Sequence, residues 1–133
     1  MNRILIVEDT TEQIAIVTSL LQEKGYQFLV AQNLEEAQLA IRTGNFTGVL
    51  TDLHFPEKES ADKIPPCGFA VLVLCAEKAL SVVVVSDIDH HFAAYAKIVV
   101  EGIAKLHPVG KIPFIMDSKN WSQGLQLLEE GVV

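Results

Sequence analysis

Short, continuously apolar segments alternate with longer segments of helical character along the whole sequence. The apolar segments predict strands at residues 3–7, 26–31, 46–51, 81–86 and 112–117. The longer segments predict helices at residues 11–24, 34–42, 69–79, 90–106 and 121–130. Thr10 or Thr11 can cap the start of the first helix, and Gly25 can end it in a left-handed conformation.

Strands that are apolar throughout are typical of a parallel sheet whose two faces are covered by helices. Right-handed crossovers then predict an α/β fold with a doubly wound, five-stranded parallel sheet. We expect the strand order 2-1-3-4-5, in which the first, third and fourth strands are neighbours. Ligands bind such sheets at the carboxyl ends of the strands, so the residues that directly follow each strand are the candidates for function.

Length and composition favour one compact domain over residues 1–133. The sequence shows no signal peptide and no apolar run of membrane-spanning length, so we expect a cytoplasmic protein. The net charge of −7, without clusters of Lys or Arg, argues against nucleic-acid binding. Cys67 and Cys75 are too few for a disulfide framework or a zinc site, which fits a reducing compartment.

Acidic side chains gather at the predicted strand ends. Glu8 and Asp9 follow the first strand, and Asp52 follows the third. The fourth and fifth strands end near Ser86, Asp87, Asp117, Ser118 and Lys119. In the expected strand order the first three carboxylates meet in one pocket, where they repel one another unless a cation such as Mg²⁺ joins them. A metal, a lysine and a hydroxyl around a carboxylate nucleophile are the groups that phosphoryl transfer needs.

These motifs resemble the receiver domain of response regulators in two-component signalling. They are Ile4-Leu-Ile-Val-Glu-Asp9, Val49-Leu-Thr-Asp-Leu-His-Phe-Pro56, Val82-Val-Val-Val-Ser86 and Lys119, and they follow one another over nearly the whole chain. The most specific motif is Asp52-Leu-x-x-Pro56 after an apolar strand. The resemblance implies a flavodoxin-like fold and phosphorylation by a histidine kinase or phosphotransfer protein. The domain itself would catalyse the transfer, so we do not expect an enzyme that acts on separate substrates.

The resemblance also implies roles for single residues. Asp52 would accept the phosphoryl group. Mg²⁺ would be bound by Glu8, Asp9, Asp52 and the backbone carbonyl of His54, and the phosphoryl oxygens by Ser86 and Lys119.

Each of these residues also has an ordinary explanation when it is taken alone. Glu8 and Asp9 favour the positive N-terminus of the first helix. Asp52 can be a turn residue, and Ser86 and Lys119 are unremarkable in loops. The prediction therefore depends on finding all of them together at strand ends.

Two segments differ from the usual receiver pattern in the middle of the chain. A polar insertion at residues 57–67 follows Pro56. It could serve as a lid or as a docking loop for a partner, or it could be a neutral insertion. The third helix, 69–79, lacks a polar face, so we expect the insertion, the fourth helix or a second subunit to cover it. An alternative is that residues 70–75 are partly strand, because valines suit strands.

The segment from Ser86 to Lys119 is longer than is usual for receivers, and the extended fourth helix at 90–106 would absorb the excess. Receivers carry a switch aromatic in the fifth strand. Met116 occupies the simplest aligned position here, and Phe114 is the nearest aromatic residue. Two additional carboxylates, Asp87 and Asp117, would oppose a phosphoryl group unless a cation offsets them.

Three functions are consistent with the sequence. The first is a stand-alone receiver that is phosphorylated on Asp52 and acts through a downstream protein, or through a homodimer formed by the fourth helix and fifth strand or by the apolar third helix. The second is a phosphorylation-independent pseudo-receiver that serves as an interaction module. The third is a small phosphohydrolase, since residues 82–89 resemble the haloacid-dehalogenase motif, with Asp87 as nucleophile and Asp89 as general acid.

Overall fold

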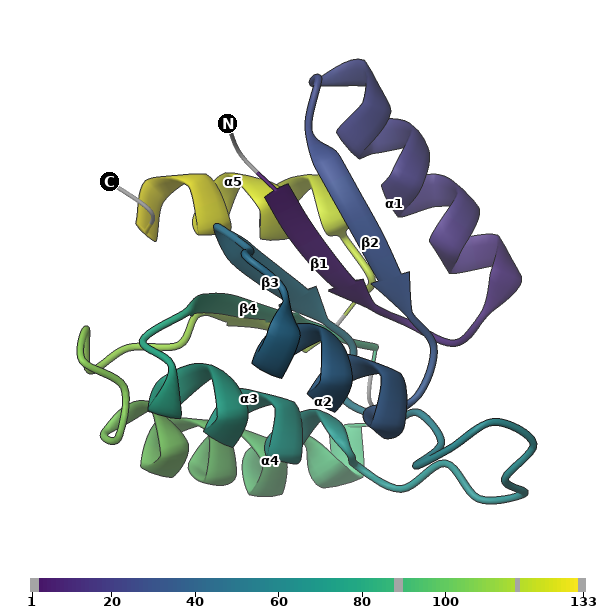
Figure 1. The fold of residues 1–133 in the computed structure, drawn as a ribbon. Helices are drawn as coiled ribbons and strands as arrows, with labels where there is room; N and C mark the ends of the chain where they lie inside the picture. The colour runs from purple at the N-terminus through teal and green to yellow at the C-terminus, as the bar shows by residue number, and fades with distance from the viewer. Residues whose placement is uncertain (1–2, 88–89, 117, 132–133) are drawn as a thin grey trace.

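A computed structural model describes residues 3–87, 90–116 and 118–131 of the chain. The strands are β1 (Arg3–Val7), β2 (Gln27–Ala31), β3 (Gly48–Thr51), β4 (Ser81–Val85) and β5 (Phe114–Ile115). The helices are α1 (Thr11–Glu23), α2 (Leu34–Thr43), α3 (Gly68–Glu77), α4 (His90–Ala104) and α5 (Trp121–Gly131). These strands pair in parallel in the order β2-β1-β3-β4-β5 (Figure 1). The predicted α/β fold and strand order are therefore confirmed.

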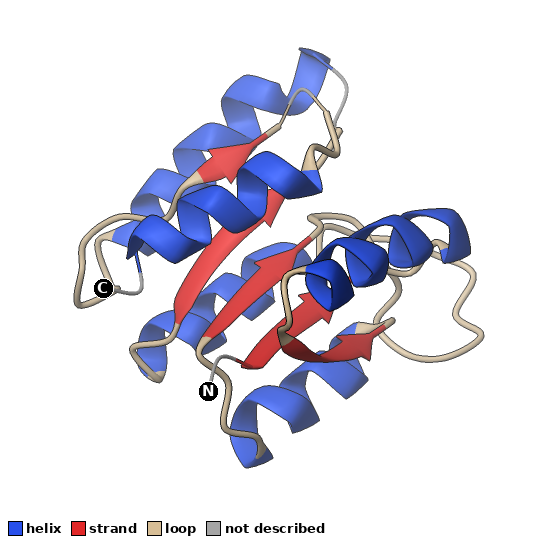
Figure 2. Ribbon diagram, turned by 90° about the horizontal axis from the view of Figure 1, so that it is seen from above, coloured by secondary structure: helices blue, strands red, loops and turns tan. Residues whose placement is uncertain are grey.

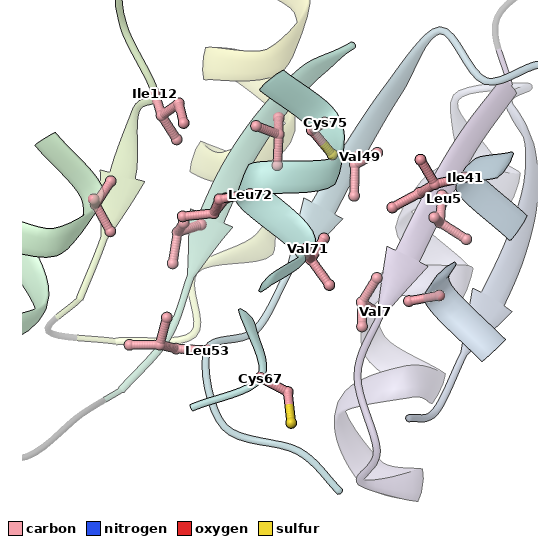
Figure 3. Packing of buried hydrophobic residues seen from close by; sticks show 14 of the residues in the cluster. Leu5, Val7, Ile41, Val49, Leu53, Cys67, Val71, Leu72, Cys75 and Ile112 are labelled. Carbon is pink, nitrogen blue, oxygen red and sulfur yellow. The ribbon is translucent and has the colours of Figure 1, made fainter. Parts of the chain in front are cut away.

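Helices cover both faces of the sheet, and each face has its own hydrophobic layer (Figure 2). Successive strand residues point to opposite faces, so Leu5 and Ile6 belong to different layers. Leu5 packs in the layer with Ile41 of α2 and Leu72 of α3 (Figure 3). Ile6 packs in the layer of α1 and α5, together with Leu125. Because both faces are closed by apolar side chains, the strand ends are the places that remain for polar chemistry.

Two elements end differently from what the sequence predicts. β5 has two residues rather than the expected 112–117. It begins only after Pro113, which has no N–H to donate to the ladder, and Asp117 lies outside the described residues. α4 ends at Ala104 rather than at residue 106. The reason is a tightened last turn, in which the Leu106 N–H donates to the carbonyl three residues earlier at 2.9 Å.

The apolar third helix is helical over Gly68–Glu77, so the alternative of a partial strand at 70–75 is wrong. It lies between α2 and α4 and packs against both, so two helices flank its sides (Figure 1). The ring of Phe69 makes an edge contact with the ring of Tyr95 in α4, with 6.0 Å between the centroids. No helix in the described parts of the chain has the length and apolar character to cross a membrane.

The two ends of the insertion after β3 are held together, so β3 keeps its pairing with both neighbouring strands. Phe55 pairs with Pro66 in an isolated parallel bridge, and the carbonyls of the next two residues, 56 and 57, accept the first N–H groups of α2 at 3.0 and 2.9 Å. Gly68 then brings α3 so close to the chain after β3 that an added Cβ would lie 2.6 Å from the carbonyl oxygen of Asp52. The loop between these points extends away from α2 and α3, at the lower right of Figure 1.

Candidate functional site

Three carboxylates meet where β1 and β3 end. The two strands are neighbours and pair Val7 with Thr51, so the residues that follow them emerge side by side. Glu8, Asp9 and Asp52 each offer a carboxylate oxygen, and these three oxygens lie within 4.8 Å of one another. Glu8 is fully buried and Asp52 is 3% exposed, whereas Asp9 is half-buried. The strand order thus brings together the acidic residues that the sequence singled out.

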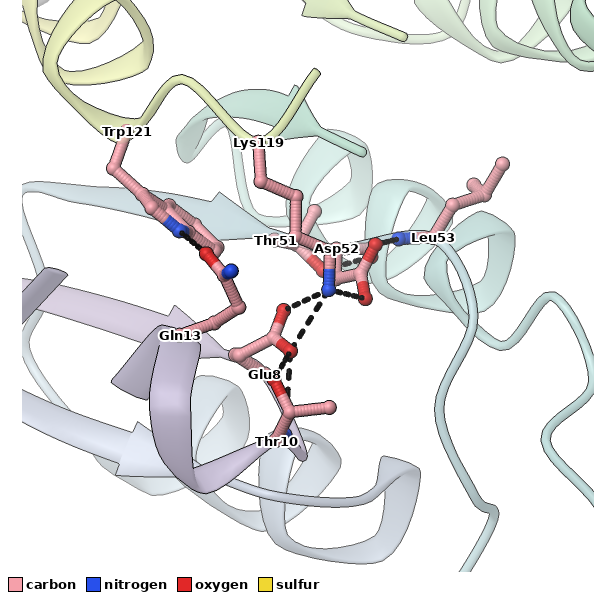
Figure 4. Close-up of polar contacts among 8 residues, drawn as sticks. All are labelled: Glu8, Thr10, Gln13, Thr51, Asp52, Leu53, Lys119 and Trp121. Atoms are coloured by element: carbon pink, nitrogen blue, oxygen red, sulfur yellow. Dashed lines mark hydrogen bonds and ion pairs between the residues drawn. The ribbon is translucent and has the colours of Figure 1, made fainter. Parts of the chain in front are cut away.

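Lys119 reaches into this group from the connection between β5 and α5 (Figure 4). Its Nζ lies 3.0 Å from Oε1 and 3.2 Å from Oε2 of Glu8, and 3.1 Å from Oδ2 of Asp52. The lysine side chain is 14% exposed, so these ion pairs form largely out of contact with water. Buried pairs are held together more strongly than surface pairs, but each charge also loses its hydration.

Glu8 has a second partner that the sequence did not predict. The hydroxyl of Thr10 donates to Glu8 Oε1 at 2.7 Å, and the Thr10 N–H donates to the same oxygen at 3.2 Å. Thr10 does occupy the N-cap position of α1, but its side chain makes no capping hydrogen bond. Thr10 is thus the N-cap residue, one of the two predicted positions, but its hydroxyl is turned toward the charged Glu8 acceptor and accepts no N–H of the helix.

Asp52 is held by the main chain that follows it. The Leu53 N–H donates to Asp52 Oδ1 at 2.7 Å, and the Thr51 hydroxyl donates to the Asp52 carbonyl at 2.7 Å. One carboxylate oxygen thus bonds to an amide and the other lies against the ammonium of Lys119. This arrangement fixes the direction in which the carboxylate faces.

The site holds more negative charge than its lysine offsets. Burial and the Glu8 carboxylate raise the pKa of Asp52 from 3.8 to about 7, against the opposing effects of Lys119 and the Leu53 N–H. Burial, and then Glu8, also raise the pKa of Asp9. Burial disfavours the charged form of Lys119, but Asp52 and Glu8 outweigh it and raise the pKa of the ammonium. An additional cation would relieve this repulsion.

The residues present fit Mg²⁺ as that cation. The donors of the group are all carboxylate oxygens, which Mg²⁺ prefers, and half-buried Asp9 leaves room for the waters that Mg²⁺ keeps. Glu8, Asp9 and Asp52 would hold the ion, and Glu8 is also paired with Lys119. His54 follows closely after Asp52 with a half-buried side chain, and the role of its backbone carbonyl stays a prediction.

The next two candidates follow the fourth strand, and one of them is buried while the other is exposed. Ser86 directly follows β4 and is 1% exposed, and its N–H donates to the Ile115 carbonyl of β5 at 2.8 Å. Asp87 is exposed and does not belong to the acidic group at β1 and β3. Asp89, the general acid of the hydrolase hypothesis, lies outside the described residues.

β5 and the residue that directly follows it carry the two candidates for the switch position. Met116 is 9% exposed and belongs to the hydrophobic layer of α2, α3 and α4. Phe114 is half-buried and packs against the same layer. The aromatic ring in this strand is therefore part of the hydrophobic packing.

One polar contact near the site carried no signal in the sequence. The indole Nε1–H of Trp121, at the start of α5, donates to Oε1 of Gln13 in the first turns of α1 at 2.9 Å (Figure 4). The two residues are 108 positions apart in the chain, and neither belongs to a motif. A glutamine on a helix and a tryptophan at a helix start are ordinary by themselves, so only the tertiary structure identifies this pair.

Solved structures with the same arrangement of strands and helices support the fold. No protein-family model and no curated protein matches the sequence. Among solved structures, a CheY-like response regulator receiver domain protein from Methanospirillum hungatei has a TM-score of 0.77 at 20% identity, covering 99% of this chain and 94% of that one. A Thermotoga maritima response regulator, solved with Mg²⁺ and BeF, has a TM-score of 0.69 at 21% identity and full coverage of both chains.

A third structure is the receiver domain of a sensor histidine kinase from Pseudomonas aeruginosa, which has a magnesium ion in its active-site cleft. Its TM-score is 0.68 at 11% identity, with 98% of this chain and 97% of that chain covered. At such identities the likeness concerns the backbone. With its strand order and its five helices, this chain has the fold of CheY-like response regulator receiver domains.

Proposed function

We propose that this protein is a Mg²⁺-dependent phosphoacceptor domain that takes a phosphoryl group on Asp52 and signals through protein contacts. The observation that carries the proposal is the placement of Lys119 between Glu8 and Asp52, beside a third carboxylate, at the carboxyl edge of a receiver-type sheet. A structural ion pair needs two charges. Here three carboxylates share one lysine, which is an arrangement that favours binding a cation and a phosphoryl group.

The proposed chemistry uses the Asp52 carboxylate, whose Oδ2 lies 3.1 Å from the ammonium of Lys119. An oxygen of the Asp52 carboxylate attacks the phosphorus of a phosphohistidine or a small acyl phosphate. A new P–O bond forms, the P–N or P–O bond of the donor breaks, and the leaving imidazole or carboxylate departs with the electron pair. Lys119 lies 3.1 Å from Asp52 and is placed to offset the charge of the incoming phosphoryl oxygens. We propose that Ser86, which is buried and follows β4 beside β3, donates a hydroxyl proton to one of them.

When bound, Mg²⁺ would neutralise negative charge at the phosphoryl group and keep Asp52 ionised. The protein supplies the rest. Leu53 N–H and Lys119 fix the two oxygens of Asp52, and Thr10 holds Glu8 in place. Because the whole reaction takes place on a residue of the domain itself, we propose no turnover of separate substrates.

The proposed partners are a histidine kinase or phosphotransfer protein as donor, and a downstream protein as receiver of the signal. Exposed apolar side chains on α4, Tyr95 and Ile98, support output by protein contact. The acidic chain supports neither nucleic acid nor anionic membranes as a partner, and we propose a cytoplasmic location.

The test is phosphorylation with acetyl phosphate in the presence of Mg²⁺, followed by intact-protein mass spectrometry. We expect one phosphoryl adduct that is labile in base, absent without Mg²⁺, and absent in Asp52→Asn. Glu130→Gln is a matched control, because Glu130 is an exposed carboxylate of α5. An adduct that persists in Asp52→Asn, or no adduct in the parent protein with acetyl phosphate or phosphoramidate, would overturn the proposal.

A phosphorylation-independent interaction module is the second candidate. The packing of Phe114 into the hydrophobic layer favours it, since this ring cannot act as an aromatic switch without disturbing the core, and buried Met116 has no ring. In that case partner capture and oligomeric state are the same for the parent protein and Asp52→Asn, with or without Mg²⁺ and BeF. The hydrolase hypothesis requires turnover of an aryl phosphate that Asp87→Asn abolishes, and exposed Asp87 offers no support for it.

A further inference from the structure

The contact between Gln13 and Trp121 ties the first turns of α1 to the start of α5, directly beside Lys119. Trp121 is 2% exposed and packs in the layer of α1 and α5 with its indole N–H turned toward Gln13 (Figure 4). A buried indole N–H without an acceptor costs about 1–3 kcal/mol. Because the acceptor, Gln13, belongs to α1, the position of α1 influences the position of the indole ring. Gln13 is itself half-buried and lies four residues after Asp9.

Main-chain hydrogen bonds connect Trp121 to the backbone of Lys119. The Trp121 N–H donates to the Lys119 carbonyl at 3.1 Å, which closes a tight turn between the two residues. Asn120, within this turn, accepts from the Gln123 N–H with its side chain and from the Gly124 N–H with its carbonyl, at 3.1 and 3.0 Å. The backbone of Lys119 is therefore held to the first turn of α5, and the first turn of α5 is held to α1 by the indole.

We propose that Gln13 and Trp121 are positioning residues that hold the ammonium of Lys119 between Glu8 and Asp52, and that they thereby set the rate of phosphoryl transfer. The rate part rests on the proposed function; the positioning part does not. A lysine has four rotatable carbons and a compact charge, so the place of its ammonium depends on how its backbone is anchored. In a transfer reaction that depends on orientation, a substitution far from the reacting atoms can greatly slow the reaction if it misplaces a reacting group by about 1 Å.

Chemical labelling of Lys119 tests the positioning part without Mg²⁺ and without a phosphodonor. The probe is acetic anhydride, and the readout is the acetylation rate of Lys119 relative to exposed Lys97 by peptide mass spectrometry. The variants are Trp121→Phe, which removes the donor together with part of the buried ring, Gln13→Leu, which removes the acceptor, and the double variant. We expect Lys119 to react about fivefold faster in each, because it is no longer held.

The double variant distinguishes this contact from general loosening. If the two residues act through one hydrogen bond, the double variant labels no faster than either single variant. Gln22→Leu, on the exposed side of the same helix, is expected to label like the parent protein, and Gln13→Glu restores slow labelling because a carboxylate also accepts from the indole. Unchanged labelling of Lys119 in folded Gln13→Leu, or additive effects of the two changes, would overturn the positioning part.

The rate part is read from phosphorylation by acetyl phosphate at saturating Mg²⁺. We expect the first-order rate constant to fall about tenfold in Gln13→Leu and in Trp121→Phe, with the midpoint of Mg²⁺ binding unchanged, because Lys119 meets the phosphoryl group and not the metal. An unaltered rate alongside faster labelling would contradict the rate part. A parent protein that labels as expected but accepts no phosphoryl group would instead contradict the proposed function.

Discussion

The two ends of the sheet bury polar groups in opposite ways. At the carboxyl end, the side chains of Glu8, Asp52 and Lys119 contact one another largely out of contact with water. At the amino end, the buried ring of His107 lies between main-chain groups: its Nδ1 accepts from the Val109 N–H at 3.2 Å, and its Nε2 donates to the Leu80 carbonyl at 2.9 Å. At the carboxyl end the carboxylates outnumber the lysine, whereas at the amino end both ring nitrogens of His107 have a hydrogen-bond partner.

The surroundings of the two ends match this difference. A pocket of about 130 Å³ at the amino end is lined partly by His107 and by apolar side chains that include Val83 and Leu128. The carboxyl end has a half-buried aspartate and a raised Asp52 pKa instead. The comparison shows that the polar ring at the amino end is satisfied by main-chain groups, while the carboxyl end keeps crowded carboxylates whose repulsion an added cation would relieve. The following changes test that contrast.

The largest effect is expected from Lys119→Met. Glu8 and Asp52 lose their shared counter-charge, and breaking a buried ion pair on one side costs about 3–5 kcal/mol. Chemical unfolding at pH 8 without Mg²⁺ measures the loss, and Lys97→Met on the exposed face of α4 is the control, with a change below about 0.5 kcal/mol. A loss in Lys119→Met no greater than in the control would show that the charges at this edge are not coupled.

Gly68→Ala is expected to destabilise by about 3 kcal/mol, because its Cβ would meet backbone atoms of Asp52 and Leu53 at 2.6 and 2.7 Å. Gly48→Ala, in β3, is the matched change. There the Cβ would meet the side chain of Leu128 at 2.8 Å, and a side chain can move, so we expect about 1 kcal/mol. Equal losses in thermal unfolding would mean that the chain after Asp52 can shift as easily as a leucine.

His107→Leu removes the polar ring at the amino end and leaves the Val109 N–H and the Leu80 carbonyl without it. We expect a loss of about 2 kcal/mol in urea unfolding, with no change in phosphorylation of Asp52, because the ring is at the opposite end of the strands. A phosphorylation defect in this folded variant would contradict the separation of the two ends.

The smallest effect concerns pH. The pKa of Asp52 is raised from 3.8 to about 7, so the folded protein holds this proton more tightly than the unfolded chain does. Its contribution to stability without Mg²⁺ is therefore fully present below the unfolded value and is lost as pH rises through about 7. Binding of Mg²⁺ requires the ionised form, so its affinity should fall by up to about tenfold per pH unit below that value.

Titration calorimetry between pH 5.5 and about 8 measures this dependence, with Asp87→Asn as the control for general acidity. Asp87 is an exposed aspartate at the neighbouring strand end, so its removal should leave the profile in place. A pH-independent Mg²⁺ affinity would show that Asp52 stays ionised without the metal.

Local patterns in the sequence were enough to predict the sheet and its acidic edge. Continuous apolar runs predicted the five strands, and Gly25, with φ of +78°, ends the first helix as its position indicated. The ends of β5 and α4 differed, because Pro113 and the tight turn at Leu106 act through hydrogen bonds that periodicity does not show. Thr10 differed for a similar reason, since the competing acceptor, Glu8, is itself placed by the fold.

By itself, the sequence determined which residues follow which strand, and parallel pairing of apolar strands then carries Glu8, Asp9 and Asp52 to one edge. Only the tertiary structure decided how that edge is completed. The sequence predicted Lys119 near this edge, but its pairing with Glu8 and the contact of Trp121 with Gln13 depend on how α1 and α5 pack on the same face of the sheet. Side-chain hydrogen bonds across more than a hundred residues have no periodicity, so no pattern along the chain reveals them.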